Sequence, residues 1–330
     1  MRKRITPLLT ICLLIAFATL PVIPFAFAQD EGFTSDDQSG NDPREFTSKF
    51  MPYYRYTELE NDVEVNEFTL FGFFAFNPRF GMTYELPIGK EVDYSDVDEF
   101  KEFKAGGGGD ELPPIGSDPG AGGDIAFNDI EDDGDVVGMG DLGMRFFLRP
   151  RQLEFPFMEG KKNFSIMPLV EWTIPTATKD VLGGEALIAS PGVVLVFDLP
   201  IEKPPLGLAF FAMMNFYDFD LWKDSKVGHT SRFRGRWFYM QPLSAPAFVD
   251  NPADKSFHIF DLSGLYAMTE FQPVYDFKEN EFSFWVGPEI GKILREGNIV
   301  YAKPGFGIDP DEQDGDRKWT FELGWRYFFK

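Results

Sequence analysis

The sequence predicts an all-β protein, a closed antiparallel transmembrane β-barrel of about twelve strands that follows an N-terminal signal peptide. Three observations favour this fold class. The N-terminus carries an export signal, no later apolar run is long enough for a spanning helix, and many segments alternate apolar with polar residues. Only helices and closed barrels satisfy their backbone hydrogen bonds inside a bilayer. An exported membrane protein without spanning helices is therefore expected to be a barrel.

The N-terminus has the three parts of a signal peptide. A basic start over residues 2–4 precedes an apolar run over residues 8–20, and the segment closes with small residues up to Ala28. We expect residues 1–28 to be the signal peptide, cleaved after Ala28, and residues 29–44 to form a disordered periplasmic lead-in. The single cysteine, Cys12, lies within the signal, so we expect no disulfide and no thiol chemistry in the mature chain.

The chain is strongly acidic and rich in phenylalanine. Its 31 basic and 53 acidic residues give a net charge of −22, and removal of a signal with three basic residues leaves 28 against 53, or −25. Nucleic-acid binding needs a basic surface, so this charge excludes it. Aromatic residues make up 17% of the chain, with 38 Phe. Aromatic-rich strands with polar partners are typical of a wall that faces lipid on one side and water on the other.

The C-terminal segment shows the alternation most clearly. From Trp319 to Phe329 the odd-numbered positions are all aromatic or apolar, whereas the even-numbered positions include Thr320, Glu322 and Arg326. A run of about ten alternating residues has the length of a tilted membrane strand. This aromatic end also resembles the C-terminal strand by which outer-membrane proteins reach the barrel-assembly machinery.

The same alternation predicts the other strands of a barrel domain over residues 45–330. The additional segments are 47–58, 66–77, 80–89, 138–150, 164–175, 185–199, 206–222, 232–243, 257–276, 282–290 and 298–308. An even count fits single-chain bacterial barrels, which carry their longer loops outside the cell. With the N-terminus in the periplasm, the long acidic segment 90–135 becomes an outer loop. The strand count then places both termini in the periplasm.

Aromatic residues near the predicted strand ends suit the girdles that barrels place at the membrane interfaces. They are Tyr53, Tyr56, Trp172, Trp222, Trp237, Tyr239, Trp319 and Trp325. In a soluble protein the same residues would be ordinary β core.

The acidic run in the loop 90–135 does not form an EF-hand. Asp129, Glu131, Asp133 and Gly134 match its first half, but the twelfth position is Gly140, where a bidentate Glu is required. We therefore predict no metal site. Two interpretations stay open for this acidic run. It binds divalent ions loosely, or it is a charged segment that is solvated.

Catalytic motifs are missing from the sequence. His229 and His258 are the only histidines, and no H-E-x-x-H, G-x-S-x-G or Cys/His cluster occurs. Ser231 lies two residues from His229, but residues at that spacing in a loop do not by themselves define a catalytic pair. We expect no enzymatic activity and no cofactor.

Polar positions of the predicted strands should face the interior of the barrel, because inward and outward residues alternate along every strand. The candidate lumen-lining residues are Asp141, Arg145, Arg149, Glu171, Glu289, Glu322 and Arg326. One hypothesis is a charged pore that binds or filters a polar or amphipathic solute. The alternative is a network in which these groups pair with one another and plug a narrow barrel.

Two sequence motifs resemble a family of outer-membrane transporters associated with the meta-pathway of phenol degradation. The segment from Gly138 to Gly143 is similar to the family's G-x-G-D-L signature, and the segment from Pro175 to Gly183 is similar to its P-T-A-T-x-D-x-L-G loop. With weaker similarity farther on, the resemblance covers residues 138–330 in the same order. It implies a monomeric outer-membrane barrel that passes small molecules, hydrophobic or aromatic ones among them.

Three functional classes follow from these observations. The first is an outer-membrane channel or transporter for small molecules. The second is a non-transporting structural or envelope barrel with a plugged lumen, and the third is a soluble secreted β-sandwich binding protein. For either barrel, the expected partners are outer-membrane lipid, lipopolysaccharide and the barrel-assembly machinery. A small solute would be a further partner of the channel.

Overall fold

The structure is a computed structural model, and the part of the chain that it describes is an antiparallel barrel. The described residues are 48–59, 63–77, 80–94, 135–148, 152–153, 164–179, 182–199, 209–223, 229–244, 256, 258–278, 280–295, 297–308 and 317–329. The expected signal peptide with its cleavage site at Ala28, the lead-in 29–44 and residues 95–134 of the acidic loop lie outside them. So does Arg149.

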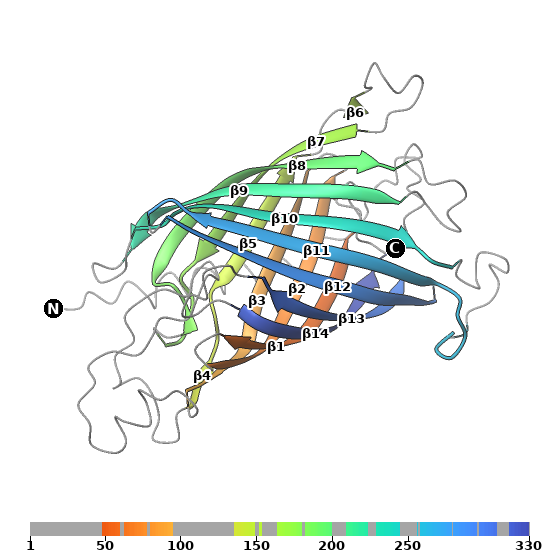
Figure 1. The fold of residues 1–330 in the computed structure, drawn as a ribbon, viewed down its shortest axis with the longest axis horizontal. Helices are drawn as coiled ribbons and strands as arrows, with labels where there is room; N and C mark the ends of the chain where they lie inside the picture. The colour runs from red at the N-terminus through yellow and green to blue at the C-terminus, as the bar shows by residue number, and fades with distance from the viewer. Residues whose placement is uncertain are drawn as a thin grey trace. The chain divides into compact units, whose positions relative to one another are not determined.

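Twelve described strands close into a ring, which confirms the predicted fold class (Figure 1). They are β1 (Lys49–Leu59), β2 (Glu64–Asn77), β3 (Phe80–Asp93), β5 (Leu142–Leu148), β7 (Phe164–Ile174), β8 (Ala186–Asp198), β9 (Phe210–Lys223), β10 (Ser231–Pro242), β11 (Leu265–Asp276), β12 (Glu281–Arg295), β13 (Asn298–Gly307) and β14 (Arg317–Phe328). Each strand pairs antiparallel with the next, and β1 pairs with both β2 and β14, so the ring has no free edge. Among the described residues, no helix has the length and apolar character to cross a membrane.

The place between β3 and β7 is filled by a strand in three pieces. The short β4 (Asp135–Gly138) pairs with β3, β5 pairs with both β3 and β7, and β6 (Gln152–Leu153) pairs with β7. The predicted strand 138–150 corresponds mainly to the middle piece. Its first break, at residues 139–141, lies beside the connection between β7 and β8.

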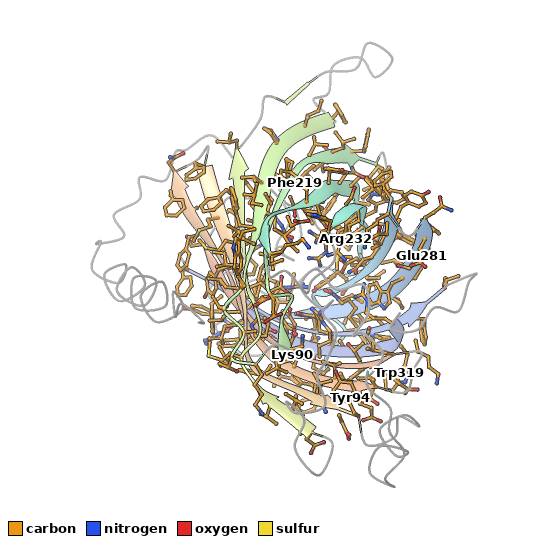
Figure 2. All side chains as sticks on the ribbon, turned by 90° about the vertical axis from the view of Figure 1, so that its left-hand side faces the viewer. Lys90, Tyr94, Phe219, Arg232, Glu281 and Trp319 are labelled. Atoms are coloured by element: carbon orange, nitrogen blue, oxygen red, sulfur yellow. The ribbon has the colours of Figure 1, made fainter. Side chains whose placement is uncertain are left out.

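Inward and outward residues alternate along the strands. On β14 Thr320, Glu322 and Arg326 are buried inside the ring, called here the lumen, while Leu323 and Trp325 are exposed on the outside. Figure 2 looks along the strands at the end of the barrel that carries Lys90 and Arg232. We call this the loop end, since the acidic loop connects there. The opposite end, where β1 begins and β14 finishes, is the terminal end.

The lumen has an apolar part toward its terminal end. Sixteen buried residues form one cluster there, which includes Phe73, Phe147, Met214, Phe238 and Met268. Lys49 begins β1 and Phe328 ends β14 at this end of the barrel. Lys49 pairs with Phe73 of the cluster, and Phe328 packs against the cluster. Asp218 and Arg234 lie nearer the loop end, whereas Arg326 lies two residues before the end of β14 at the terminal end.

The aromatic girdle prediction is partly wrong. Trp222, Trp319 and Trp325 are exposed on the outside of the barrel, as a girdle requires. Tyr53, by contrast, is buried in the lumen, where its hydroxyl donates a hydrogen bond to Glu85. Tyr53 shares the inward face of β1 with Arg55, because side chains two residues apart on a strand point the same way.

Strand β11 begins later than predicted, at Leu265 rather than at residue 257. The preceding residues form a turn, in which Asp261 accepts hydrogen bonds from the backbone N–H and hydroxyl of Ser263. Gly264 then adopts a φ of 68°, which favours glycine and ends the turn. Hydrogen bonds from the Ser263 hydroxyl and the Lys292 ammonium hold the pKa of Asp261 well below its usual value.

Candidate functional site: the charged lumen

The structure places five of the seven predicted lumen residues in the interior. Arg145, Glu171, Glu289, Glu322 and Arg326 are buried on β5, β7, β12 and β14. Asp141 lies in the break between β4 and β5 and binds a connection rather than another lumen charge. The seventh, Arg149, is not among the described residues.

The first group of charges centres on two carboxylates that each serve two arginines. Glu171 forms ion pairs with Arg145 and with Arg234, the latter at 2.5 Å between Nη2 and Oε1. Asp218 accepts hydrogen bonds of 3.0 Å from the Nε atoms of Arg234 and Arg232. Arg145 and Arg234 also approach the ring of Phe216, at 5.3 and 4.7 Å from the guanidinium carbon to the ring centroid.

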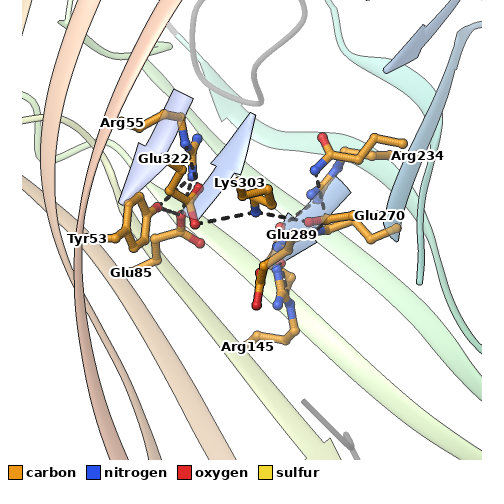
Figure 3. A network of polar contacts seen from close by, with 12 residues as sticks. Tyr53, Arg55, Glu85, Arg145, Arg234, Glu270, Glu289, Lys303 and Glu322 are labelled. Carbon is orange, nitrogen blue, oxygen red and sulfur yellow. Dashed lines mark hydrogen bonds and ion pairs between the residues drawn. The ribbon is translucent and has the colours of Figure 1, made fainter. Parts of the chain in front are cut away.

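The second group crosses the barrel from β10 to β3, and Figure 3 shows most of its members. Glu270 binds Arg236 at 2.7 Å and Lys303 at 3.2 Å. Lys303 also lies 3.4 Å from Glu322, which pairs with Arg55 at 3.2 Å.

Beyond Glu322 this second group continues to a third carboxylate. The Nη2 atom of Arg55 lies 3.9 Å from Glu85, which also accepts the hydrogen bond from Tyr53. Cations and carboxylates thus alternate along the whole chain of contacts. Glu270 and Glu322 each form ion pairs with two cations, and Glu85 forms one with Arg55 at the end of the chain of contacts.

Two tyrosines, Tyr266 and Tyr301, contact a further ion pair of the lumen, that of Arg326 with Glu289. Arg326 binds both oxygens of Glu289, at 2.9 and 3.1 Å, and Tyr266 donates a hydrogen bond of 2.7 Å to the same carboxylate. Tyr301 donates one of 2.8 Å to Glu322, and the guanidinium of Arg326 lies 4.0 Å from its ring centroid.

Each tyrosine lies across a glycine directly opposite on the next strand. Tyr266 faces Gly291, and Tyr301 faces Gly324. A Cβ on either glycine would come within 2.3 Å of the ring. Because the glycines have no side chain, each tyrosine ring can lie against the next strand. Its hydroxyl then reaches the carboxylate two residues before the glycine.

Sequence reasoning missed more than half of the charged lumen. The missed residues include Arg55, Glu85, Asp218, Arg232, Arg234, Arg236, Glu270 and Lys303. A signal was present on β10, where Arg232, Arg234 and Arg236 occupy alternate positions of one face. Lipid would not accept three arginines, so this face had to be the inner one.

Asp141 joins the two motifs on which the family resemblance rests. Its Oδ1 accepts hydrogen bonds of 3.0 Å from the backbone N–H groups of Thr176 and Ala177, and its Oδ2 accepts one of 2.8 Å from Gly184. The carboxylate thereby holds both ends of the β7–β8 connection. Beside it, the N–H of Thr178 donates to the carbonyl of Met139 at 3.1 Å.

Close packing of this connection depends on a glycine of the first motif. A Cβ on Gly138 would lie 2.1 Å from the hydroxyl of Thr178 and 2.6 Å from the side chain of Leu182. On the other side, Lys90 donates a hydrogen bond of 3.3 Å to the carbonyl of Leu182. The connection therefore folds against the break in the strand and against the charged lumen.

Two cavities follow one another along the lumen. The cavity toward the loop end has a volume of about 150 Å³ and is lined by charged and polar side chains together with Asp141 and Leu182. The cavity toward the terminal end has a volume of about 160 Å³ and is lined by charged side chains together with Phe73, Phe147 and other apolar residues. Both volumes are close to the ~150 Å³ of a protein cavity that holds one benzene molecule.

Ser256, His258 and Asp261 contact one another in the order serine, histidine and acid, as in a serine hydrolase triad. Ser256 lies 3.2 Å from Nε2 of His258, whose Nδ1 lies 2.8 Å from Asp261. All of these contacts are at the exposed surface, and none of the three residues lines either cavity. His229 binds Asp220, also at the surface. Among the described residues, no group of three or more His, Cys, Asp or Glu could hold a metal ion.

No family model matches the sequence, and no curated protein matches it in sequence. Solved structures do match. The COG4313 outer membrane channel from Pseudomonas putida F1 is similar with a TM-score of 0.54 at 12% identity, over 87% of this chain and 99% of that one. The KdgM porin has a TM-score of 0.42 at 8% identity, over 85% and 99%.

A third similar structure is the CymD monoaromatic hydrocarbon channel. Its TM-score is 0.40 at 9% identity, over 90% of this chain and 93% of that one. Of the three, only the Pseudomonas channel is similar enough to carry an argument, and at 12% identity the argument concerns the fold alone. The barrel implied by the family resemblance is thus confirmed: this chain has the fold of an outer-membrane channel.

Proposed function

We propose that the protein is an outer-membrane channel for small molecules. The observation that carries this proposal is a closed barrel whose charged lumen contains two successive cavities. Paired charges narrow this lumen without filling it, and the cavities suit solutes about the size of one aromatic ring. A single ring is also within the class of small, hydrophobic or aromatic molecules that the family resemblance implies.

The apolar outer face of the barrel indicates that the barrel lies in a membrane. Exposed apolar and aromatic side chains on β14, such as Leu323 and Trp325, favour contact with lipid. We propose export by residues 1–28 with cleavage after Ala28, insertion by the barrel-assembly machinery and contact with lipopolysaccharide at the loop end. In this proposal the barrel works as a monomer, with residues 29–44 in the periplasm and residues 90–135 outside the cell. It needs neither cofactor nor catalysis.

Reconstitution tests the channel against the structural barrel with a plugged lumen. The mature protein, inserted into planar bilayers, is expected to give discrete current steps, and its liposomes are expected to swell in small solutes. If the wild-type barrel stays silent while Arg145→Ala conducts, the charges plug the lumen and the channel proposal is wrong. Arg145 is the informative position because it lines both cavities.

A further inference from the structure

The two cavities meet at a part of the lumen lined mostly by cations. We propose that this part selects small organic anions. The charged end of the solute passes the guanidinium groups of Arg55, Arg145 and Arg236, and its apolar part occupies the cavity toward the terminal end. This inference rests on the proposed channel function and adds the class of solute.

The residues shared by both cavities define the meeting point. Five described residues line both, and they are Arg55, Thr83, Glu85, Arg145 and Arg236. Three guanidinium groups therefore face one carboxylate and one hydroxyl, an excess of two positive charges. The arginines come from β1, β5 and β10, so cations approach the path from well-separated parts of the ring. Rings of Arg or Lys are the usual device of anion-selective pores.

Exposure strengthens this positive character at two of the three arginines, which are more exposed than their partners, whereas Arg145 and its partner Glu171 are almost equally buried. The side chain of Arg236 is 27% exposed, whereas that of its partner Glu270 is 3% exposed. Arg55 is 21% exposed and its partner Glu322 is 6% exposed. A solute in the lumen therefore meets these two guanidinium groups before Glu270 and Glu322. Glu85, at 31%, is the one shared carboxylate that stays open to the path.

The cavities as a whole have the same sign of charge. Their described linings contain nine cationic and seven anionic side chains, an excess of two positive charges. The chain as a whole has a net charge of −22, so the lumen differs in sign from the protein around it. A positive lumen in an acidic protein raises the local concentration of anions along the path.

The cavity toward the terminal end supplies the apolar half of the proposed site. Its lining contains six cations and four carboxylates together with seven apolar side chains, which are Met51, Phe71, Phe73, Phe147, Met214, Phe238 and Met268. Aromatic and thioether groups pack well against an aromatic ring. With room for about one benzene-sized group, this cavity fits a monocyclic carboxylate better than a longer or a doubly charged solute.

Reversal potentials test the inference on the full mature barrel. Across a KCl gradient the wild type is expected to pass chloride in preference to potassium. In separate gradients of sodium benzoate and of benzylammonium chloride, whose ring-bearing ions are close in size, benzoate is expected to permeate better than sodium, and benzylammonium worse than chloride.

Two substitutions and a control locate the selectivity. Arg236→Gln is expected to lower the chloride-to-potassium ratio about tenfold, because one charge about 6 Å from the path in a water-like medium changes the permeability of each ion about threefold and in opposite directions. Glu85→Gln should raise the ratio. Arg232→Gln is the matched control, because it removes an arginine from the same strand that lines neither cavity, and it should change the ratio less than Arg236→Gln does. Both arginine variants are expected to fold, since Glu270 keeps Lys303 and Asp218 keeps Arg234.

The outcomes separate this inference from the proposed function. A current that prefers cations overturns the selection of anions and leaves a channel. An equal change of the chloride-to-potassium ratio in Arg236→Gln and Arg232→Gln does the same. A barrel without any current overturns the channel proposal and this inference with it. Anion preference that responds more strongly to Arg236 and Glu85 than to Arg232 supports the site described here.

Discussion

Carboxylates in the lumen are placed between cations, and this arrangement decides what a single substitution does. Glu171 touches Arg145 and Arg234 and is buried with them. Burying a charge is costly unless it is paired, so a carboxylate shared by two arginines offsets the burial of both. The same logic applies to Glu270 between Arg236 and Lys303. The networks are thus stable as units, and their members are not independent.

Glu171→Gln tests this account of the buried charges. The substitution leaves Arg145 buried without its carboxylate, so the free energy of unfolding of the refolded barrel is expected to fall by about 3–5 kcal/mol. Glu58→Gln is the control, because Glu58 pairs with the exposed Lys318 and should cost about 1 kcal/mol or less. Urea titrations of both variants measure the difference. Equal losses would show that burial of the Glu171 network adds no stability.

Among the elements, the broken strand β4–β5 and the β7–β8 connection form one unit. Asp141 closes the base of the connection through three backbone N–H groups, and Leu182 from the connection lines the cavity toward the loop end. The break in the strand is what leaves Asp141 free to turn toward the connection. One carboxylate therefore positions a connection that borders the solute path.

Asp141→Ala should release this connection. A hydrogen bond to a charged group contributes about 1.5–3 kcal/mol, so exchange of the Thr176, Ala177 and Gly184 amides is expected to accelerate about tenfold or more. Asp220→Ala is the matched control. Asp220 accepts a hydrogen bond of 2.7 Å from the Thr230 amide in the β9–β10 connection, and only that amide should exchange faster. Unchanged exchange at Thr176 in Asp141→Ala would contradict the role of Asp141.

Sequence alone could predict what depends on local alternation. The period of two on β14 places Glu322 and Arg326 inside, and register then sets Glu322 directly opposite both Arg55 and Lys303. It could not predict the contact of Glu171 with Arg234, because β7 and β10 are separated by two strands in the ring. Contacts across a lumen depend on the closed shape, which no single strand encodes.

Strand ends were harder to predict than strand faces. Residues 257–264 have apolar members that suit a strand, but the hydrogen bonds of Asp261 and the positive φ of Gly264 make a turn instead. Tyr53 was misplaced for a related reason. A tyrosine near a strand end suits a girdle by composition, and only its alternation with Arg55 indicates that it faces inward.

At the scale of the whole molecule, one path links these features. The cavity toward the loop end, the arginines where the cavities meet and the apolar cavity toward the terminal end follow one another along a closed barrel. Each part alone is compatible with a plugged, structural barrel. Together they describe a route with a charged middle and an apolar exit, which is why passage of a solute is the central claim.

Thiol modification at Thr83 tests this claim most directly. Thr83 lines both cavities, and the single cysteine, Cys12, lies in the proposed signal peptide, so Thr83→Cys in the mature barrel gives one reactive site on the proposed path. A charged methanethiosulfonate reagent is expected to reduce the single-channel current sharply. Leu323→Cys, on the outer face, should show no change after the same treatment. Full modification at position 83 with an unaltered current would contradict the account, because solute would then not pass between the cavities.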